Sequence, residues 1–251
     1  MDEESGTRFD QVGTNHLTER GTVTSVAGKV NRAAQFVATD SAYLDAGDTA
    51  DLSTGDVSFG IAAWVYLDSL PSWEIIASKY GRDTPTQEWD LAFADDVHLG
   101  ASKNFLFGIR ETPGTGGAFT FATAPAPITT GTWNFVAGWY DASADTVNIQ
   151  VNNGPVTTTT AAGALGDTVT PFFVGAEAWD SPTSFFDGRI DEVGFWKRPL
   201  TTEDLSTLYE EPGVLNPDAP SGPIIPEPSS LLLIGIGLLG LAGWRRRLEV
   251  S

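Results

Sequence analysis

FFDGRIDEVGFWKRPLTTEDLSTLY, residues 185–209, joins a strand to the beginning of a short helix. We expect the strand over residues 189–195. Thr201 and, three residues later, Asp204 resemble a capping box ahead of Leu205, which predicts a short helix. No other stretch before residue 211 predicts a helix convincingly, so the domain should be built from strands and turns.

Two further stretches show the side-chain alternation of strands. In VSFGIAAWVYLD, residues 57–68, the alternate positions from Val57 to Leu67 share one apolar face, while Trp64 and Tyr66 share the other. Both faces carry large apolar or aromatic side chains, so we expect a central strand of a sheet. DTVNIQVNNGPV, residues 145–156, alternates apolar and amide side chains before Asn153-Gly154, a pair that favours a tight hairpin turn.

The other expected strands are short and are separated by turn residues. They cover residues 33–39, 74–79, 89–94, 105–110, 118–123, 133–140 and 172–176. Many short strands of this kind are typical of an all-β antiparallel sandwich or jelly roll. The 251 residues suffice for one such domain over 1–210, followed by a linker rich in proline and glycine over 211–225 and a distinct tail over 226–251.

Composition removes several functional classes. The chain has 14 basic and 33 acidic residues and a formal charge of −19, which repels phosphate backbones and excludes nucleic acid as a natural partner. It has no cysteine, so disulfides, thiolate metal sites and thiol nucleophiles are excluded. With only two histidines, His16 and His98, the chain has few side chains from which to build a histidine-based catalytic site or a zinc site.

Four segments occur in a recognisable order. They are GKVNRAAQFVATDSAYLDAG (28–47), SFGIAAWVYLD (58–68), TWNFVAGWYDASADTVNIQVNNG (132–154) and the closing segment 185–209. Together they resemble the laminin-G-like jelly roll of the concanavalin A-like lectin and glucanase superfamily, over about Ser5 to Tyr209. The family's first strand is missing or degraded here, which leaves one sheet edge undefined. The fold hosts lectins, glycosidases and interaction modules, so it does not by itself decide the activity.

The tail reads PEPSSLLLIGIGLLGLAGWRRR over residues 226–247. Its apolar and glycine run, residues 231–244, is shorter than the roughly 20 residues of a typical membrane-spanning helix, so we expect a short transmembrane segment. Arg245, Arg246 and Arg247 follow it directly. Because arginines beside a span stay on the cytoplasmic side, the preceding domain is expected outside the inner membrane.

The order of Pro226-Glu227-Pro228, a short apolar helix and an arginine cluster resembles the PEP-CTERM sorting signal of Gram-negative bacteria. This resemblance implies an exosortase as partner, a transient inner-membrane anchor, and a final place in the cell envelope or extracellular matrix. Hosts of such proteins commonly make extracellular polysaccharide, a second expected partner. The start, MDEESGTRFD, has neither a basic n-region nor an apolar h-region, so we expect a signal peptide upstream of it.

Catalytic residues are not predicted. Glu88 and Asp90 have the i, i+2 spacing that places two carboxyls on one strand face, as retaining glycoside hydrolysis requires. The related glucanases carry Glu-x-Asp-x-x-Glu, whereas residue 93 here is Phe. We therefore favour a structural interpretation, with Trp89 in the core.

Calcium is the candidate cofactor, because jelly rolls of this type often hold one calcium ion and calcium prefers carboxylate and carbonyl oxygens. The resemblance implies that N-terminal and C-terminal strands pair, which would bring Asp45, with Asp48, near Asp191, with Asp187. The alternative is that Asp191 and Glu192 cap a turn or pair with Arg189.

Loop tryptophans are the candidate glycan-stacking residues, because aromatic faces pack on sugar rings. Trp73 and Trp179 are the best placed, and partial burial in the domain is the alternative for each. The leading hypothesis is a non-enzymatic, exported module that binds carbohydrate or mediates adhesion. A divergent glycoside hydrolase and a purely structural matrix protein are the alternatives.

The tail generates a first prediction. Behind a working signal peptide in a host with an exosortase, the wild-type chain should lose about 25 residues from its C-terminus, the size of a minimal membrane anchor. Glu227→Ala should insert but remain unprocessed, whereas replacing Arg245, Arg246 and Arg247 with alanine should weaken retention and topology. Intact-mass measurement decides: a full-length C-terminus on protein released to the medium would contradict the sorting signal.

Overall fold

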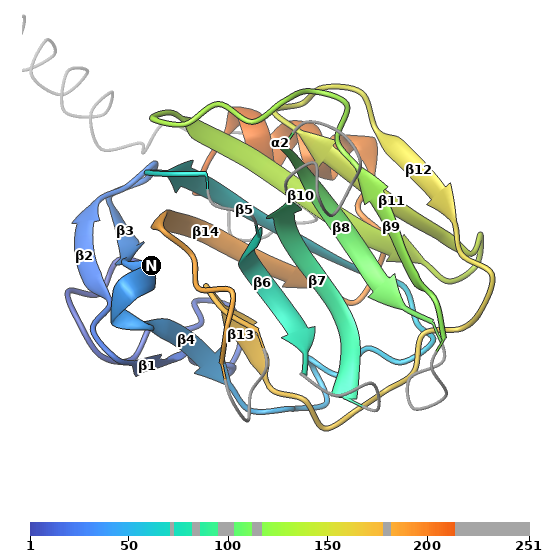
Figure 1. Cartoon of the computed structure of the whole chain (residues 1–251), viewed down its shortest axis with the longest axis horizontal. Helices are drawn as coiled ribbons and strands as arrows, with labels where there is room; N and C mark the ends of the chain where they lie inside the picture. The colour runs from blue at the N-terminus through green and yellow to red at the C-terminus, as the bar shows by residue number, and fades with distance from the viewer. Residues whose placement is uncertain (71–72, 82–85, 95–102, 112–116, 178–181, 214–251) are drawn as a thin grey trace, which may run out of the picture. The chain divides into compact units, whose positions relative to one another are not determined.

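A computed structural model describes residues 1–70, 73–81, 86–94, 103–111, 117–177 and 182–213 (Figure 1). The described residues belong to one compact unit, Met1–Pro217. The predicted linker beyond residue 213, the sorting motif and the apolar segment 231–244 lie outside the described residues. Within the described ranges, no helix is both long and apolar enough to cross a bilayer.

Two antiparallel sheets face each other in an all-β jelly roll, which confirms the predicted fold class. Sheet 1 has the order β1-β4-β13-β6-β7-β8-β9, with β1 (Thr18–Arg20), β4 (Tyr43–Ala46), β13 (Phe172–Val174), β6 (Trp73–Tyr80), β7 (Gln87–Ala94), β8 (Asn104–Arg110) and β9 (Phe119–Thr123). Sheet 2 has the order β12-β11-β10-β5-β14-β3-β2, with β12 (Thr157–Thr160), β11 (Thr146–Val151), β10 (Trp133–Asp141), β5 (Phe59–Leu67), β14 (Gly188–Trp196), β3 (Arg32–Phe36) and β2 (Thr24–Ala27).

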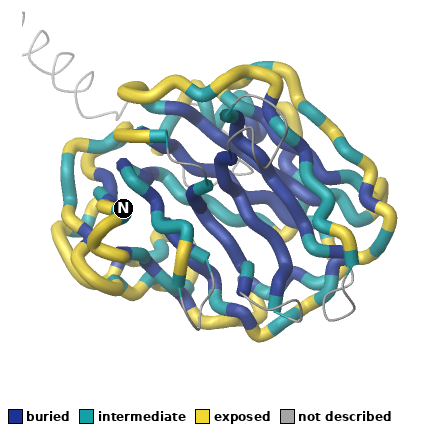
Figure 2. The backbone as a smooth tube through the Cα atoms, in the orientation of Figure 1, coloured by how far each residue is buried: buried dark blue, intermediate teal, exposed yellow. Residues whose placement is uncertain are grey.

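Strand β5 is central, as the alternation predicts, because it pairs with both β10 and β14. Phe59, Ile61 and Val65 lie fully buried in the main core between the sheets. On the opposite face, Trp64 packs in a second cluster with Leu205 of helix α2 (Thr202–Glu210). Figure 2 shows the buried strands surrounded by more exposed loops.

The helix and its cap confirm the prediction from the closing segment. The Thr201 hydroxyl accepts a hydrogen bond from the Asp204 amide at 3.1 Å, and the Asp204 carboxylate accepts one from the Thr201 amide at 2.7 Å. Arg198 donates to the same carboxylate at 2.6 Å. This reciprocal cap fixes the point at which the chain leaves β14 and covers sheet 2.

The predicted hairpin forms between β11 and β12, but its turn is one residue earlier than expected. Asn152 and Asn153, with φ of 50° and 54°, are the central residues, and the Gly154 amide donates to the Val151 carbonyl at 2.9 Å. Asparagine tolerates the left-handed region well enough to replace the predicted glycine there. Val57 was also predicted in the strand but lies before it and is exposed.

Four strands were not predicted, namely β1, β2, β4 and β12. Each has three or four residues. Three of them lie within the N-terminal third of the chain, and β12 consists only of threonine. Such stretches carry too few alternating apolar residues to show a period of two.

Glu74 is a buried carboxyl near the start of β6, the middle strand of sheet 1. Its Oε2 accepts a hydrogen bond from the Asp187 amide at 3.0 Å, and its side chain is almost entirely inaccessible. Burial is the main reason that the pKa of Glu74 rises to about 8, and the nearby Asp187 carboxylate adds to the effect.

Because the folded state favours neutral Glu74, the contribution of this group to stability should be fully present below the ordinary glutamate pKa and be lost as the pH rises through about 8. Glu74→Gln keeps an acceptor for the Asp187 amide and should make the fall in stability with pH shallower by this contribution. Thermal unfolding between pH 5 and 9 measures it. Glu4→Gln, at an exposed position, is the control. Equal pH dependence of wild type and Glu74→Gln would show that Glu74 titrates normally.

Candidate functional site

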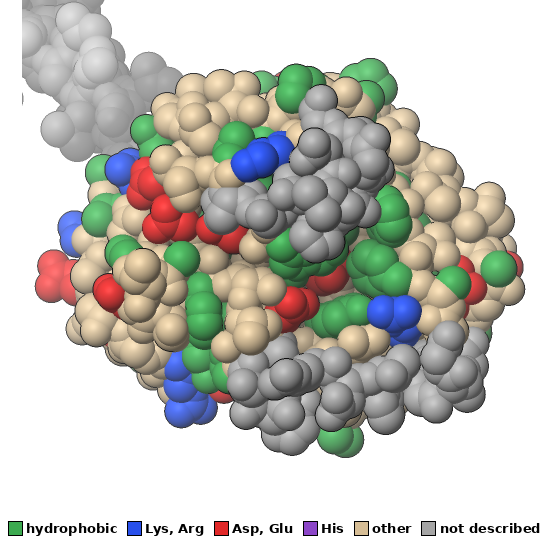
Figure 3. All heavy atoms as spheres, viewed as in Figure 1, with side chains coloured by type: hydrophobic (Ala, Val, Ile, Leu, Met, Phe, Trp, Pro, Cys, Tyr) green, Lys and Arg blue, Asp and Glu red, His purple; other side chains and the backbone are tan. Residues whose placement is uncertain are grey.

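A hollow of about 400 Å³ opens on the outer face of sheet 1. It is lined by Trp73, Tyr80, Asp90, Arg110, Phe119, Glu177 and Ser184. Figure 3 shows acidic side chains within this hollowed face, with hydrophobic and basic side chains beside them. Aromatic walls around a few charged groups are the usual composition of a site for a small polar ligand.

The sheet pleat places these residues on the outer face. In β7, Trp89 and Leu91 point into the main core, so Asp90 points outward. In the neighbouring β8, Phe107 and Ile109 point inward, so Arg110 points outward too. Charged groups of two adjacent strands therefore share one surface.

Arg110 extends across the sheet from β8 toward β6. Its guanidinium donates to the Tyr80 hydroxyl at 2.6 Å and to the Gly117 carbonyl at 3.0 Å, and it lies 5.4 Å from the centre of the Phe119 ring. Its Nε is buried and, within the part of the chain that the structure describes, has no hydrogen-bond partner. Burial raises the pKa of Tyr80 to about 12, so this hydroxyl stays neutral.

Asp90 has a fully buried carboxyl, only 1% exposed. Its Oδ1 finds no hydrogen-bond partner among the described residues. Burial raises the pKa of Asp90 well above its usual value, and the nearby Glu177 carboxylate raises it further. A buried acceptor left without a partner is costly unless a ligand or water satisfies it.

Glu177 lies beyond β13 and contributes the second carboxyl of the hollow. Its Oε1 accepts a hydrogen bond from the Ser184 hydroxyl at 2.6 Å. Burial raises the pKa of Glu177 as well. Among the described residues of the hollow, two carboxyls with raised pKa values thus lie beside one guanidinium.

Phe119 forms one wall because Gly108 leaves space beneath it. A Cβ added at Gly108 would lie 2.2 Å from the Phe119 ring, closer than real atoms approach. Gly108 is the residue directly opposite Asp90 in the β7–β8 ladder. The aromatic wall is therefore seated on the strand beside the buried carboxyl.

The spacing of Glu88 and Asp90 does not produce a shared site. Glu88 is enclosed by the Thr54 hydroxyl, by the Thr168 amide at 3.0 Å and by the buried Lys79 ammonium at 3.4 Å. It does not line the hollow. Trp89 between them is fully buried in the core, as the structural interpretation predicts.

Asp45 and Asp191 lie in different sheets, on β4 and β14. The expected approach fails because β14 pairs with β3, whereas β4 pairs with β13. Asp45 binds Arg20 at 2.9 Å. Asp48 binds Lys79 at 2.7 Å, and Asp187 accepts from the Ser69 hydroxyl.

Asp191 is fully buried and acts as a cap for a turn. Its Oδ2 accepts from the amides of Lys29 and Val30 at 2.9 and 3.0 Å, and its Oδ1 accepts from the Glu192 amide at 2.9 Å. In the described residues, no group of three or more histidine, aspartate or glutamate side chains is arranged to hold a metal ion. These donor sets do not fit a calcium ion shared by Asp45 and Asp191, and calcium binding elsewhere stays a prediction.

Of the two predicted stacking residues, Trp73 lines the hollow at the start of β6, and Trp179 lies outside the described residues. Sequence reasoning missed Arg110, Phe119 and Glu177 as site residues. Arg110 ends a predicted strand. Because Phe107 and Ile109 are the apolar residues of one strand face, the pattern could have predicted that Arg110 points to the opposite, outer face. Glu177 follows a strand directly and gave no comparable signal.

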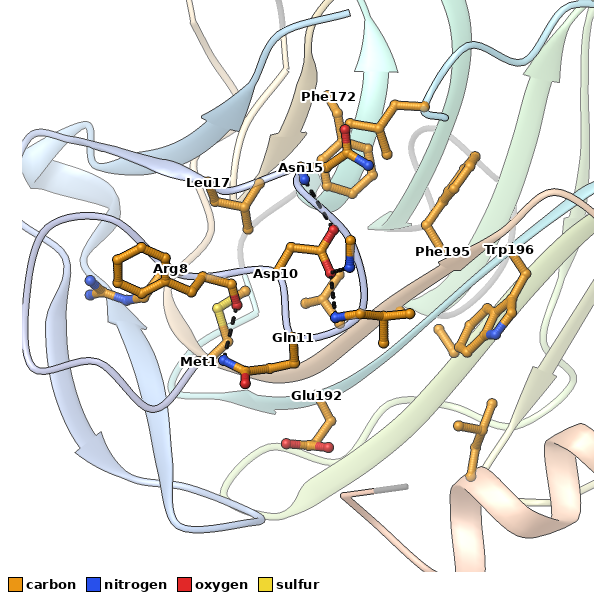
Figure 4. Close-up of a pocket in the computed structure, with 18 of the residues that line it drawn as sticks. Met1, Arg8, Asp10, Gln11, Asn15, Leu17, Phe172, Glu192, Phe195 and Trp196 are labelled. Carbon is orange, nitrogen blue, oxygen red and sulfur yellow. Dashed lines mark hydrogen bonds between the residues drawn. The ribbon is translucent and has the colours of Figure 1, made fainter. Parts of the chain in front are cut away.

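A second cavity of about 480 Å³ lies between the N-terminal loop, β14 and α2 (Figure 4). Its walls include Phe195, Trp196 and Leu208. The carboxylate of Asp10 accepts hydrogen bonds from the amides of its own loop, from Val12, Gly13 and Asn15. Asp10 therefore organises the loop, and the hollow of sheet 1 is the stronger candidate site.

Comparison with known proteins identifies the family to which the domain belongs. Residues 38–206 match the model of the concanavalin A-like lectin/glucanases superfamily, and the chain belongs to this family. Residues 225–247 match the PEP-CTERM protein-sorting motif, which indicates an exported protein. No curated protein sequence matches the chain.

Solved structures share the fold at low identity. Domain 4 of AbnA, a GH43 extracellular arabinanase from Geobacillus stearothermophilus, solved with arabinotriose, has a TM-score of 0.57 and 17% identity over 82% of this chain and 100% of that chain. The binding domain of Paraclostridial Mosquitocidal Protein 1 has a TM-score of 0.61 and 11% identity over 81% of this chain and 50% of that chain. The Botulinum neurotoxin serotype G binding domain has a TM-score of 0.59 and 11% identity over 80% of this chain and 48% of that chain.

Asp191 gives a prediction about stability. Asp191→Ala should lower the free energy of unfolding by about 3 kcal/mol, because it leaves amides of Lys29 and Val30 without their acceptor. Denaturant unfolding measures this loss, and Asp40→Ala at an exposed position is the control. A melting curve with EDTA tests calcium separately, since an ion bound only by the folded state raises the melting temperature.

Proposed function

We propose that this protein is an exported, non-enzymatic carbohydrate-binding module and that the hollow of sheet 1 is its binding site. The observation that carries the proposal is Asp90, a fully buried carboxyl whose Oδ1 has no partner among the described residues, at a site walled by aromatic rings. A hydroxyl of a sugar can donate the hydrogen bond that Asp90 Oδ1 lacks. The apolar face of the sugar ring can pack against the aromatic rings.

The tail supports an extracellular role. The PEP-CTERM motif implies that an exosortase processes the chain after a transient stay in the inner membrane. The final location would then be the cell envelope or the extracellular matrix. There, a carbohydrate-binding domain would attach the protein to extracellular polysaccharide, and so serve adhesion or a biofilm matrix.

Solved structures with the same fold give weaker support for a carbohydrate ligand than the side chains of the hollow do. The arabinanase domain was solved with a bound arabinose oligosaccharide, and its whole length is covered by this chain. At 17% identity this likeness concerns the fold, so the argument for a sugar rests on the side chains of the hollow.

One observation favours a second function, divergent glycoside hydrolysis. Asp90 and Glu177 share the hollow and both have raised pKa values, and a carboxyl kept protonated by burial is the usual general acid of a glycosidase. Glu88, the sequence-predicted partner, is held away from the hollow by Lys79 and Thr168. A purely structural matrix role is the remaining alternative.

Phe119→Ala tests the binding site. Glycan-array and calorimetric binding by residues 1–217, the compact unit, should reveal a polysaccharide ligand, and Phe119→Ala should weaken its binding about tenfold through loss of ring contact. Phe9→Ala, at an exposed phenylalanine outside the hollow, should bind normally. Absence of glycan binding, or equal binding by both variants, would contradict the proposal.

The enzyme alternative has its own measurement. Reducing-sugar release that Asp90→Asn or Glu177→Gln abolishes, with Glu88→Gln retaining it, would establish hydrolysis at the hollow. We expect no such release.

A further inference from the structure

The hollow of sheet 1 contains one unpartnered acceptor and one unpartnered donor. Asp90 Oδ1 and Arg110 Nε are both buried, and neither has a hydrogen-bond partner within the described ranges. Buried polar atoms in folded proteins are almost always satisfied, so two in one hollow indicate a ligand that satisfies both.

The two groups lie diagonally across adjacent strands. Asp90 is opposite Gly108 in the β7–β8 ladder, and Arg110 is two residues further along β8 on the same face. Diagonal neighbours of this kind have Cα atoms about 7–8 Å apart. The Phe119 ring lies directly over Gly108, so a ligand that reaches both groups lies beside this ring. The separation suits a small group, with one end donating and the other accepting.

We propose, on the basis of the function inferred above, that the ligand is a neutral sugar held through two neighbouring hydroxyls, one donating to Asp90 Oδ1 and the other accepting from Arg110 Nε. The Phe119 ring, seated on Gly108, packs against the face of the same sugar. The hollow of about 400 Å³ has the size of a small-ligand site.

An acidic sugar is disfavoured by the charge of the chain as a whole. A uronate or sulfate group would approach a chain whose formal charge is −19. Among the described residues that line the hollow, Arg110 has the one guanidinium, and its two terminal nitrogens already donate to Tyr80 and to the Gly117 carbonyl, which leaves a single Nε–H for the ligand. Anionic polysaccharide therefore meets the repulsion of the chain's overall negative charge and finds no bidentate partner in Arg110.

An amino sugar is disfavoured for the opposite reason. Burial raises the pKa of Asp90 well above its usual value, so this carboxyl resists becoming the anion that an ammonium group requires. Arg110 also presents its Nε–H donor to the ligand, and an ammonium group has no acceptor for it. A hydroxyl both donates and accepts, and it carries no charge.

The test compares four classes of oligosaccharide on residues 1–217 by calorimetry: neutral, N-acetylated, uronic-acid and free-amine. We expect binding of neutral oligosaccharides, and at least about tenfold weaker binding of uronate and free-amine oligomers. Monodeoxy derivatives of the bound sugar should lose about tenfold at two adjacent positions and little at the others, because each position removes one hydrogen bond.

The variants separate the two contacts. Asp90→Leu should weaken binding about tenfold, while Asp90→Asn, which keeps an acceptor oxygen, should stay within about threefold of wild type. Arg110→Lys keeps the positive charge but removes the Nε–H donor. In this variant, the deoxy sugar that lacks the hydroxyl expected to accept from Nε–H should bind as well as the parent sugar, whereas the other deoxy sugar should still bind more weakly. Arg189→Lys, at an arginine that stacks on Tyr66 away from the hollow, should be neutral.

The outcomes distinguish this inference from the proposed function. If Phe119→Ala abolishes binding of a uronate or free-amine oligomer, the hollow is a glycan site and the neutral-diol inference is wrong. If the deoxy sugars lose the same affinity relative to the parent sugar in wild type, in Asp90→Leu and in Arg110→Lys, then Asp90 and Arg110 do not hold the hydroxyls. If no oligosaccharide binds at all, the proposed function fails together with the inference.

Discussion

The register between β7 and β8 is the constraint on which the site depends. Because side chains alternate along a strand, placing Trp89 and Phe107 in the core forces Asp90 and Arg110 to the outer face. A slip by one residue would exchange the two sets, exposing the largest core rings and burying the charged pair between the sheets. The energy that packs the core therefore also fixes the geometry of the hollow.

Strong periodicity made much of the fold predictable. The central strand β5 and the capped helix were predicted because each has a repeating pattern or a reciprocal pair of polar contacts, as at Thr201 and Asp204. The short strands escaped prediction because three or four residues cannot show a period. The pairing of β4 with β13 escaped it too, since ladder partners depend on tertiary packing and not on local sequence. That pairing is why Asp45 and Asp191 lie in separate sheets.

The hollow itself was only half predictable. Trp73 was identified from its loop position, and Asp90 was noticed through its spacing from Glu88, yet the residue that completes the arrangement comes from elsewhere in the chain. Glu177 follows β13, some 87 residues after Asp90, and no short-range pattern links them. Sites assembled from different strands of a sandwich are visible in a sequence only as isolated polar residues inside apolar strands.

Sheet 2 closes late in the sequence. Its strand β14 pairs with β3, bringing Gly188 opposite Phe36, and Asp191 then binds the amides of Lys29 and Val30. The hydrogen bonds of β3 and of the turn at Lys29 and Val30 are therefore completed only when β14, the last strand that the structure describes, is in place. Such long-range pairing forms slowly. An exported chain whose N-terminal part emerges first therefore keeps sheet 2 open until residue 196 has emerged.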